Sequence, residues 1–465
     1  MLNHQIWLTI ILACLAGVAK ADDWDDFANN LFTDLAPLLA LFGERATMQF
    51  MSQALGWEDC VILAMAPLGI ITILVSAIRV GGPGWLKAII GRARENMAAA
   101  ELELMSSTSN EVSELYNGET IVRCQGRGPV WEFIYLIPIT PRTQDPDRRP
   151  EIKVLSLEEA CKPDKKLLQK VDNGLPKAKD ESMAPPVSWI LGIDKIEWIF
   201  NKVIARSSTP TNNDVSVERG VGPVALSERP ADGSDQSPDE TIYVIRNIDT
   251  GAPNITLNLQ DNDSNRNELK VYAIIGIFLQ LCILVFFGVI AYYPAIENSF
   301  RKDDRPVDHY AFPLAVGGTL ILIIGMFICG TVVENSTEET RYKKDDKYEM
   351  RVAWIQQKHT VGDQVFDPFA TFPDYPRDII TMSQRCDKGL EKLTVIGIFI
   401  GLAGFIVQFI GLRGMNSAAT LAQLGATGIM AAIRALRLAK QWTRASSIFG
   451  EQQATNEGRG AVHEY

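Results

Sequence analysis

Five long apolar blocks alternate with polar stretches along this chain of 465 residues. They cover residues 61–78, 271–296, 310–333, 393–412 and 414–433, and none of them contains an Asp, Glu, Lys or Arg. The hydrocarbon core of a bilayer is about 30 Å thick, so a helix needs about 20 apolar residues to cross it. The pattern predicts an α-helical multi-pass membrane protein, with transmembrane helices at 60–80, 271–296, 310–333, 393–412 and 414–433.

Lys and Arg are distributed unevenly between these blocks. Of the 45 basic residues, 24 lie in segment 79–270, ten in 334–392 and five in 434–465. Cytoplasmic loops carry the excess of Lys and Arg. We therefore predict that 81–270, 334–392 and the tail 434–465 are cytosolic. The loop 297–309 is then lumenal.

The N-terminus resembles a secretory signal. Residues 6–18 form an apolar run of 13 residues, and Ala19, Lys20 and Ala21 follow it with the small-residue spacing that suits signal peptidase. We expect a cleaved signal peptide over 1–21. An uncleaved signal anchor is the alternative, because few positive charges precede the run.

The segment 22–59 is lumenal in either case and carries an apolar stripe at helical spacing. The protein is expected in a membrane of the secretory pathway, which includes the endoplasmic reticulum, the vacuole and the plasma membrane. The C-terminus is expected in the cytosol.

The segment between the first two blocks, 81–270, mixes strand and helix patterns and predicts a cytosolic α+β module. β-branched and aromatic runs bounded by Gly and Pro favour strands, and apolar residues at helical spacing favour helices. A stretch rich in Ser, Pro, Asp, Asn and Gly predicts a flexible insert at 206–240. The expected strands are 119–124 and 130–137 in one hairpin, 241–248 and 255–259, and the expected helices are 85–105, 155–171 and 187–204.

The start of the module combines apolar and cationic side chains. Trp85 and Ile89 lie near Lys87, Arg92 and Arg94, which suits a helix on anionic lipid, although packing within the module explains the pattern equally well. The second cytosolic segment, 334–392, mixes charged residues with aromatic ones. We expect it to fold against the module.

Small residues recur at regular spacing in the last two blocks. Such faces let two helices approach closely in lipid, where no hydrophobic drive joins them. The turn between the two blocks is very short, so we predict a tightly packed helical hairpin over 393–433. The predicted helix-packing residues are Gly397, Gly401 and Gly404 in one helix and Ala418, Ala422 and Ala426 in the next.

Strongly polar residues are rare within the blocks. Gln280, Gln408 and Gln423 stand out, and we expect them to form interhelical hydrogen bonds. The blocks contain no Asp, Glu, His or Arg, which are the residues that proton relays use at membrane depth. This argues against a proton-coupled pump. Pro67 is expected to kink the first helix.

Signals for catalysis and for nucleic-acid binding are absent. The net charge of −11 argues against a broad basic surface. The sequence has no HExxH, GxSxG, CxxC or P-loop motif. His359 and Asp363 lie close together, but no nucleophile or third ligand accompanies them. We expect no enzyme activity, no metal, no cofactor and no nucleic-acid partner.

Cysteines and glycosylation sequons bear on the predicted sidedness. The lumenal segments contain no pair of cysteines, so no disulfide is expected. The three sequons begin at Asn254, Asn262 and Asn335, all on the predicted cytosolic side. None of them should carry a glycan.

Several stretches resemble one family of filamentous-fungal multi-pass membrane proteins. They are residues 30–44, 65–72, 78–83 (Ile78-Arg-Val-Gly-Gly-Pro83), 90–95 and 404–414. The resemblance implies a membrane protein without an established activity, and some members are neighbours of secondary-metabolite genes. Longer members carry C-terminal ankyrin repeats, and no such repeat is visible within these 465 residues.

Two functions follow as hypotheses. The first is a non-enzymatic membrane scaffold or accessory protein that presents its cytosolic module to protein partners. The alternative is a transporter or channel for a small organic solute, which the small number of helices and the lack of internal repeats disfavour. The sequence leaves oligomerisation open, and a membrane enzyme is the least favoured class.

Overall fold

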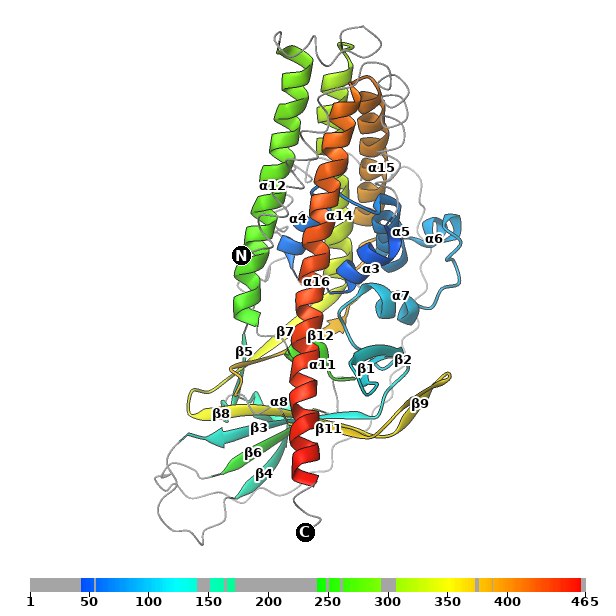
Figure 1. Cartoon of the computed structure of the whole chain (residues 1–465). Helices are drawn as coiled ribbons and strands as arrows, with labels where there is room; N and C mark the ends of the chain where they lie inside the picture. The colour runs from blue at the N-terminus through cyan, green and yellow to red at the C-terminus, as the bar shows by residue number, and fades with distance from the viewer. Residues whose placement is uncertain are drawn as a thin grey trace. The chain divides into compact units, whose positions relative to one another are not determined.

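The computed structural model (Figure 1) describes residues 43–53, 56–139, 151–162, 165–171, 241–247, 251–259, 262–293, 307–372, 376–386 and 388–460. All of them belong to one structural unit. The expected signal peptide (1–21), the expected helix at 187–204 and the expected insert (206–240) lie outside the described residues.

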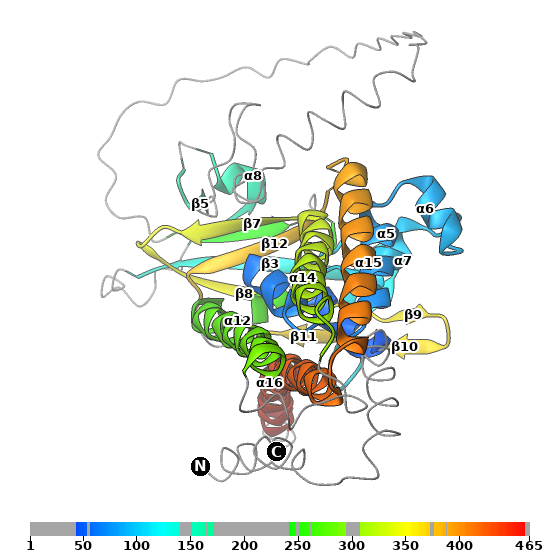
Figure 2. The same cartoon turned by 90° about the horizontal axis from the view of Figure 1, so that it is seen from above.

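Four long helices form a bundle (Figure 1). Figure 2 looks along the bundle and shows α14 between α12 and α15, with α16 beside α12. Among the described residues, these helices contain four segments that are long and apolar enough to cross a membrane: Glu268–Tyr292, Ala311–Asn335, Glu391–Arg413 and Ser417–Lys440. The full helices are α12 (Asn262–Tyr292), α14 (Ala311–Asn335), α15 (Glu391–Arg413) and α16 (Ser417–Gly460).

The two ends of the bundle differ. At one end, which we call the far end, α14 begins and α15 ends: a Cβ on Gly414 would lie 2.8 Å from the Cβ of Ala311. At the other end, which we call the module end, Asn335 closes α14 and the β-structure begins two residues later at Thr337. The β-structure returns to the bundle where α15 begins at Glu391.

The first apolar block is not a single helix, which corrects the expected span at 60–80. It forms α4 (Trp57–Ala64) and α5 (Ile70–Gly81), separated by an irregular turn. Pro67 lacks an N–H and disfavours helical geometry in the residue before it. Ala66 and Gly69 both have positive φ, at 46° and 74°. The chain therefore reverses direction at a point where the sequence had predicted only a kink.

The α4–α5 pair enters the bundle and leaves it at the same end. Near the start of α4, the Cys60 thiol contacts Glu334 Oε2 of α14 at 3.3 Å. At the end of α5, a Cβ on Gly81 would meet Val332 of α14 at 2.7 Å. Between them, Pro67 lies beside Leu322, near the middle of α14. The block is therefore a re-entrant hairpin that reaches mid-bundle and returns to the module end.

The path of the chain before the hairpin also differs from expectation. Met51 and Asp59 line a small cavity with Ser106 and Thr337, at the module end. Residues 51–53 and 56–59 therefore do not lie on the side opposite the module, where the lumenal segment 22–59 was expected. Residues 22–42 lie outside the described part of the chain.

The module is a set of antiparallel sheets with one parallel pair. The largest sheet has the order β11-β8-β3-β6-β4, and a three-stranded sheet has the order β12-β7-β5. Two hairpins, β1-β2 and β9-β10, complete the described strands. The strands are β1 (Val112–Tyr116), β2 (Ile121–Gln125), β3 (Val130–Pro138), β4 (Ile152–Ser156), β5 (Leu168–Val171), β6 (Ile242–Asn247), β7 (Thr337–Lys344), β8 (Tyr348–Gln356), β9 (His359–Val361), β10 (Gln364–Phe366), β11 (Phe369–Thr371) and β12 (Ile379–Arg385).

Segments far apart in sequence build the core of the module together. The central strand β3 pairs antiparallel with β8, placing Ile134 opposite Val352. Trp354 is fully buried, and its indole N–H donates to Glu132 Oε1 at 2.9 Å. The expectation that 334–392 folds against 81–270 is confirmed by this pairing.

Several local predictions within the module are wrong. Strands β2 and β3 do not form the expected hairpin, because β2 pairs with β1 and β3 pairs with β6 and β8. The expected strand at 255–259 is the short helix α11 (Ile255–Leu259). The expected helix at 155–171 is instead the end of β4, the short helix α8 (Leu157–Ala160) and β5. The expected helix at 85–105 is split into α6 (Gly84–Ile89) and α7 (Met97–Leu104).

Candidate functional site

The break between α4 and α5 leaves backbone carbonyls inside the bundle without partners in their own helix. One arginine donates hydrogen bonds to them. Arg434 of α16 is only 5 % exposed. Its guanidinium donates to the carbonyl oxygens of Ile62 at 2.8 Å, Met65 at 3.0 Å and Leu63 at 3.2 Å. The last carbonyls of a helix have no partner within that helix and carry partial negative charge. Arg434 therefore caps the end of α4 and the turn that follows it.

A second arginine lies one turn further along α16. Arg437 forms a bidentate ion pair with Asp59 of α4, and both side chains are buried. Its guanidinium also lies over the ring of Phe50, 5.2 Å from the ring centroid. Residues three apart on a helix lie on one face. One face of α16 therefore binds the start of α4 through Arg437 and the turn after α4 through Arg434.

Carboxylates gather at the module end of this hairpin. Glu58 and Asp59 are buried, and Glu334 of α14 accepts from the Cys60 thiol. A cavity of about 20 Å³ lies between Asp59, Cys60, Glu334 and Ser106. This volume is enough for about one water molecule, so the space beside the cluster has no room for a larger solute.

The three glutamines singled out from the sequence lie around the middle of the bundle. Gln280 donates to Gln423 at 3.3 Å, and Gln408 donates to the Thr319 hydroxyl at 2.9 Å. Both bonds join different helices, so the predicted interhelical hydrogen bonds are present for all three residues.

A second cavity of about 20 Å³ lies at the hairpin tip. Pro67, Gln408, Thr420, Gln423 and Thr427 are among the residues that line it. The Thr420 hydroxyl is buried and has no hydrogen-bond partner among the described residues. The cavity is water-sized and has a few polar groups in a mainly apolar lining, and those groups could bind a single buried water.

The predicted helix-packing glycines of α15 face α14, not α16. A Cβ on Gly404 would lie 2.3 Å from the backbone nitrogen of Leu322, and one on Gly397 would lie 2.8 Å from the Ile328 side chain. A Cβ on Gly325 of α14 would lie 2.3 Å from the Cα of Gly401. The expected tight hairpin over 393–433 is thus replaced by a tight α14–α15 pair. Ala418 and Ala426 are buried in the apolar core of the bundle, and Ala422 packs against that core.

The sequence carried a signal for this pairing that was missed. The residues of α14 that contact α15 recur at steps of four and three along the sequence. The residues of α15 that contact α14 recur at the same steps. This heptad-like spacing places them on one continuous stripe of each helix. The α14 stripe is Ala311, Ala315, Gly318, Leu322 and Gly325, and the α15 stripe is Gly397, Gly401, Gly404, Gln408 and Gly411.

The weak catalytic candidates stay apart from these features. His359 lies on β9, and Asp363 lies in the turn between β9 and β10. Within the described residues, no three His, Cys, Asp or Glu side chains are grouped so that they could hold a metal ion. The described cysteines are all free thiols.

Asn254, the first residue of one sequon, is a structural residue. It is 3 % exposed, and its side-chain oxygen accepts from the backbone N–H of Ser383 on β12 at 3.0 Å. Asn335 is the last residue of α14. The side chain of Asn262 lies outside the described part.

The chain matches no protein-family model, no curated protein and no solved structure.

Proposed function

We propose that the chain is a non-enzymatic integral membrane protein that presents its α+β module to protein partners at one membrane face. The observation that carries this proposal is the covalent and hydrogen-bonded union of module and bundle. Strand β7 begins at Thr337 directly after α14, and the Cys386 N–H donates to Ser336 O at 2.8 Å. The module is therefore held in a defined position on the helices that cross the bilayer.

The module has a surface that suits such a role. Strand β4 lies at the edge of the five-stranded sheet, and Ile152 and Val154 on it are 63 % and 66 % exposed. Exposed apolar groups on an edge strand favour pairing with another chain. We take this edge as the first place to look for a partner.

The sidedness is part of the proposal. The excess of Lys and Arg in 81–270, 334–392 and 434–465 favours a cytosolic module. Residence in the secretory pathway is part of this proposal. A cleaved signal over 1–21 does not fit the orientation, because residues 56–59 lie on the module side and no candidate span is described before them. The resemblance to the filamentous-fungal family favours metabolic enzymes as the partners, in a role linked to secondary metabolism.

A second candidate, a transporter or channel for a small organic solute, rests on a specific observation. Broken helices at membrane depth often form solute sites, and here the hairpin tip lies beside Gln408, Thr420 and Gln423. Against it, the tip cavity has room for about one water, and Arg434 already occupies the carbonyls that a cation would need.

One experiment separates the two. The full chain is purified from detergent with its bound proteins, and the same protein is tested for solute flux in liposomes. The proposal expects soluble partners that Ile152→Glu/Val154→Glu releases, with no flux. Saturable flux by the protein alone, reduced by Thr420→Val, would instead establish the transporter.

A further inference from the structure

One segment beside the bundle exposes both apolar and cationic side chains. We call residues 83–94 the α6 loop, because it contains α6. Trp85 is 52 % exposed and Ile89 is 72 % exposed, whereas Leu86 is buried against the protein. Residues four apart on a helix lie on one face. The outer face of α6 is therefore apolar.

The level of this loop along the bundle is set by its neighbours. Gly81, just before the loop, packs against Val332 in the last turns of α14 and Thr394 in the first turn of α15. The loop thus leaves the bundle where the apolar spans give way to the polar module. In a membrane, this level is the boundary between hydrocarbon and water.

Both ends of the loop are fixed at this level. Arg79, buried near the end of α5, binds Glu95 at 2.6 Å and Glu103 at 2.6 Å. Glu95 directly follows the loop, so the loop is closed at its base by this ion pair. Its outer side chains project from a fixed platform.

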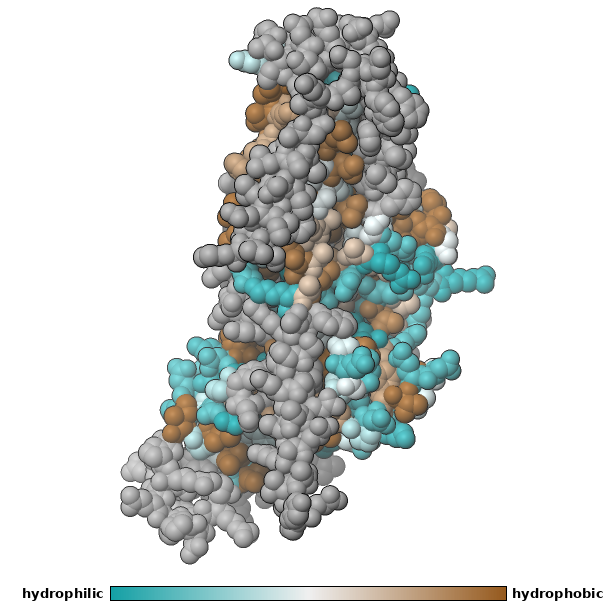
Figure 3. Space-filling model, viewed as in Figure 1, coloured by the Kyte–Doolittle hydropathy of each residue, from teal (hydrophilic) through white to brown (hydrophobic). Residues whose placement is uncertain are grey.

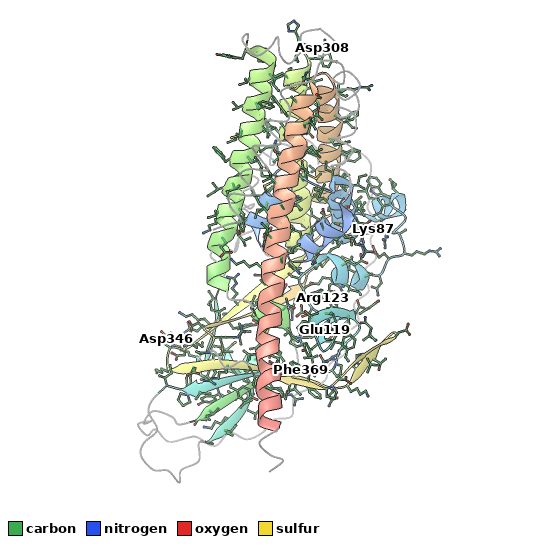
Figure 4. All side chains as sticks on the ribbon, viewed as in Figure 1. Lys87, Glu119, Arg123, Asp308, Asp346 and Phe369 are labelled. Carbon is green, nitrogen blue, oxygen red and sulfur yellow. The ribbon has the colours of Figure 1, made fainter. Side chains whose placement is uncertain are left out.

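The loop is strongly cationic. Lys87, Arg92 and Arg94 lie within it, and it contains no Asp or Glu. Arg92 reaches Glu95 at 3.0 Å, but that carboxylate already binds Arg79. Arg79 also binds Glu103, so these two guanidinium groups and two carboxylates balance, and the remaining positive charge of the loop comes from Lys87 and Arg94. Figure 4 labels Lys87 on this segment, and Figure 3 shows brown, apolar side chains over α6 next to teal, hydrophilic ones.

We propose that the α6 loop is a lipid-binding element that inserts Trp85 and Ile89 into the interface of an anionic leaflet. Trp is enriched at membrane–water interfaces, and short amphipathic segments bind there by burying their apolar face. Lys87, Arg92 and Arg94 then contact the phosphate and carboxylate groups of anionic lipids. The partner is a lipid leaflet, and the loop fixes the height of the module above it.

The test places a fluorescent reporter on the loop of the full-length protein. Ala88→Cys is labelled with an environment-sensitive dye, and the signal of the unsubstituted parent is subtracted. The protein is placed in nanodiscs of phosphatidylcholine alone, or with about 30 mol % phosphatidylserine to supply the anionic surface. Quenching is measured with a headgroup nitroxide lipid and with aqueous iodide.

The expected result is strong nitroxide quenching and weak iodide quenching, with a further increase in nitroxide quenching when phosphatidylserine is present. Lys87→Gln/Arg92→Gln/Arg94→Gln should remove that increase. Trp85→Ser/Ile89→Ser should reduce nitroxide quenching in both kinds of disc. The matched control, Lys343→Gln/Lys347→Gln/Lys358→Gln, removes three exposed cations from the module and should change nothing.

Three results would overturn the proposal. The first is iodide quenching at position 88 equal to that of a label at Gln357→Cys, an exposed position on the module. The second is a response to phosphatidylserine that survives the triple Gln variant. The third is an equal response to inorganic phosphate in phosphatidylcholine discs, which would assign the charges to a free anion.

Discussion

Arg434 stabilises the break between α4 and α5, and its removal should destabilise the bundle. Arg434→Ala leaves several buried carbonyls without donors, and each such group costs about 1–3 kcal/mol. We expect a loss of about 3 kcal/mol or more, seen as a lower thermal unfolding midpoint in detergent. Lys440→Ala on the same helix removes a half-exposed pair with Glu268 and should cost less than about 1 kcal/mol.

An equal fall in the unfolding midpoint for Arg434→Ala and Lys440→Ala would contradict this role. Arg434→Lys should fall between them, because one ammonium cannot replace a planar fork of five donors.

Asp59 and Arg437 form a buried ion pair. Removing either partner should lower the stability of the fold, because the other charge stays buried without a counter-ion. Asp59→Leu leaves a buried guanidinium without its counter-ion, a loss of about 3–5 kcal/mol. The double variant Asp59→Leu/Arg437→Met should recover most of that loss, because neither charge stays buried alone. Chemical unfolding of the two single variants and the double variant measures the coupling, and additive losses would refute it.

Glu114 gives the module a defined pH dependence. Burial raises the pKa of this carboxyl above its ordinary value of 4.5, although Arg123 and the Thr256 N–H act in the opposite direction. The folded state then holds the proton to higher pH than the unfolded chain. This contribution to stability is full below the unfolded pKa and is lost as pH rises through the folded pKa.

Glu114→Gln removes that titration. The unfolding midpoint of the variant relative to the parent should rise as pH increases through the range just above 4.5. Arg123 stays protonated over this range, so its attraction to the Glu114 carboxylate grows as Glu114 ionises and belongs to the same pH dependence. Parallel curves for parent and variant would show that Glu114 does not titrate in this way.

At the scale of elements, α14 and α15 are joined by backbone contact. Gly325→Ala would place a methyl group 2.3 Å from the Gly401 backbone, which cannot move without separating the helices. Overpacking of this kind costs about 1–3 kcal/mol. Gly317→Ala on the same helix meets nothing within 4 Å and should be neutral. Thermal unfolding of both variants checks the prediction, and equal midpoints would contradict it.

The elements differ in how far the sequence could predict them. The apolar blocks at 271–296, 310–333 and 393–412 correspond to α12, α14 and α15, because an uninterrupted apolar run determines a span. The block at 61–78 has the same composition, but its fate depends on Pro67, Gly69 and a partner, Arg434, that lies far away in sequence.

The module shows the same limit. The strand at 130–137 was visible from its β-branched and aromatic residues. Its partner β8 lies beyond α12 and α14 in the sequence, and its partner β6 lies beyond a long insert. A strand pattern identifies a strand and not its neighbour. The sequence predicted that the three glutamines form interhelical hydrogen bonds. It could not predict that Gln408 bonds to Thr319, because that contact depends on the register between α14 and α15.

At the scale of the whole molecule, the re-entrant hairpin lowers the expected number of helices that cross the membrane. The described residues contain four candidate spans, and the α4–α5 pair begins and ends beside the module. Figure 4 places Asp308 at the far end and Asp346 in the module. Trp57, Gly84 and Asp346 should therefore face one compartment, and Asp308 the other.

Cysteine labelling from one side of a sealed membrane tests this central claim most directly. Single variants Trp57→Cys, Gly84→Cys, Asp346→Cys and Asp308→Cys are exposed to an impermeant maleimide in right-side-out and inverted vesicles. We predict that positions 57, 84 and 346 react in the same vesicles and that position 308 reacts only in the others. Reaction of position 57 together with 308, and not with 84, would show that the first apolar block crosses the membrane and would contradict the re-entrant hairpin.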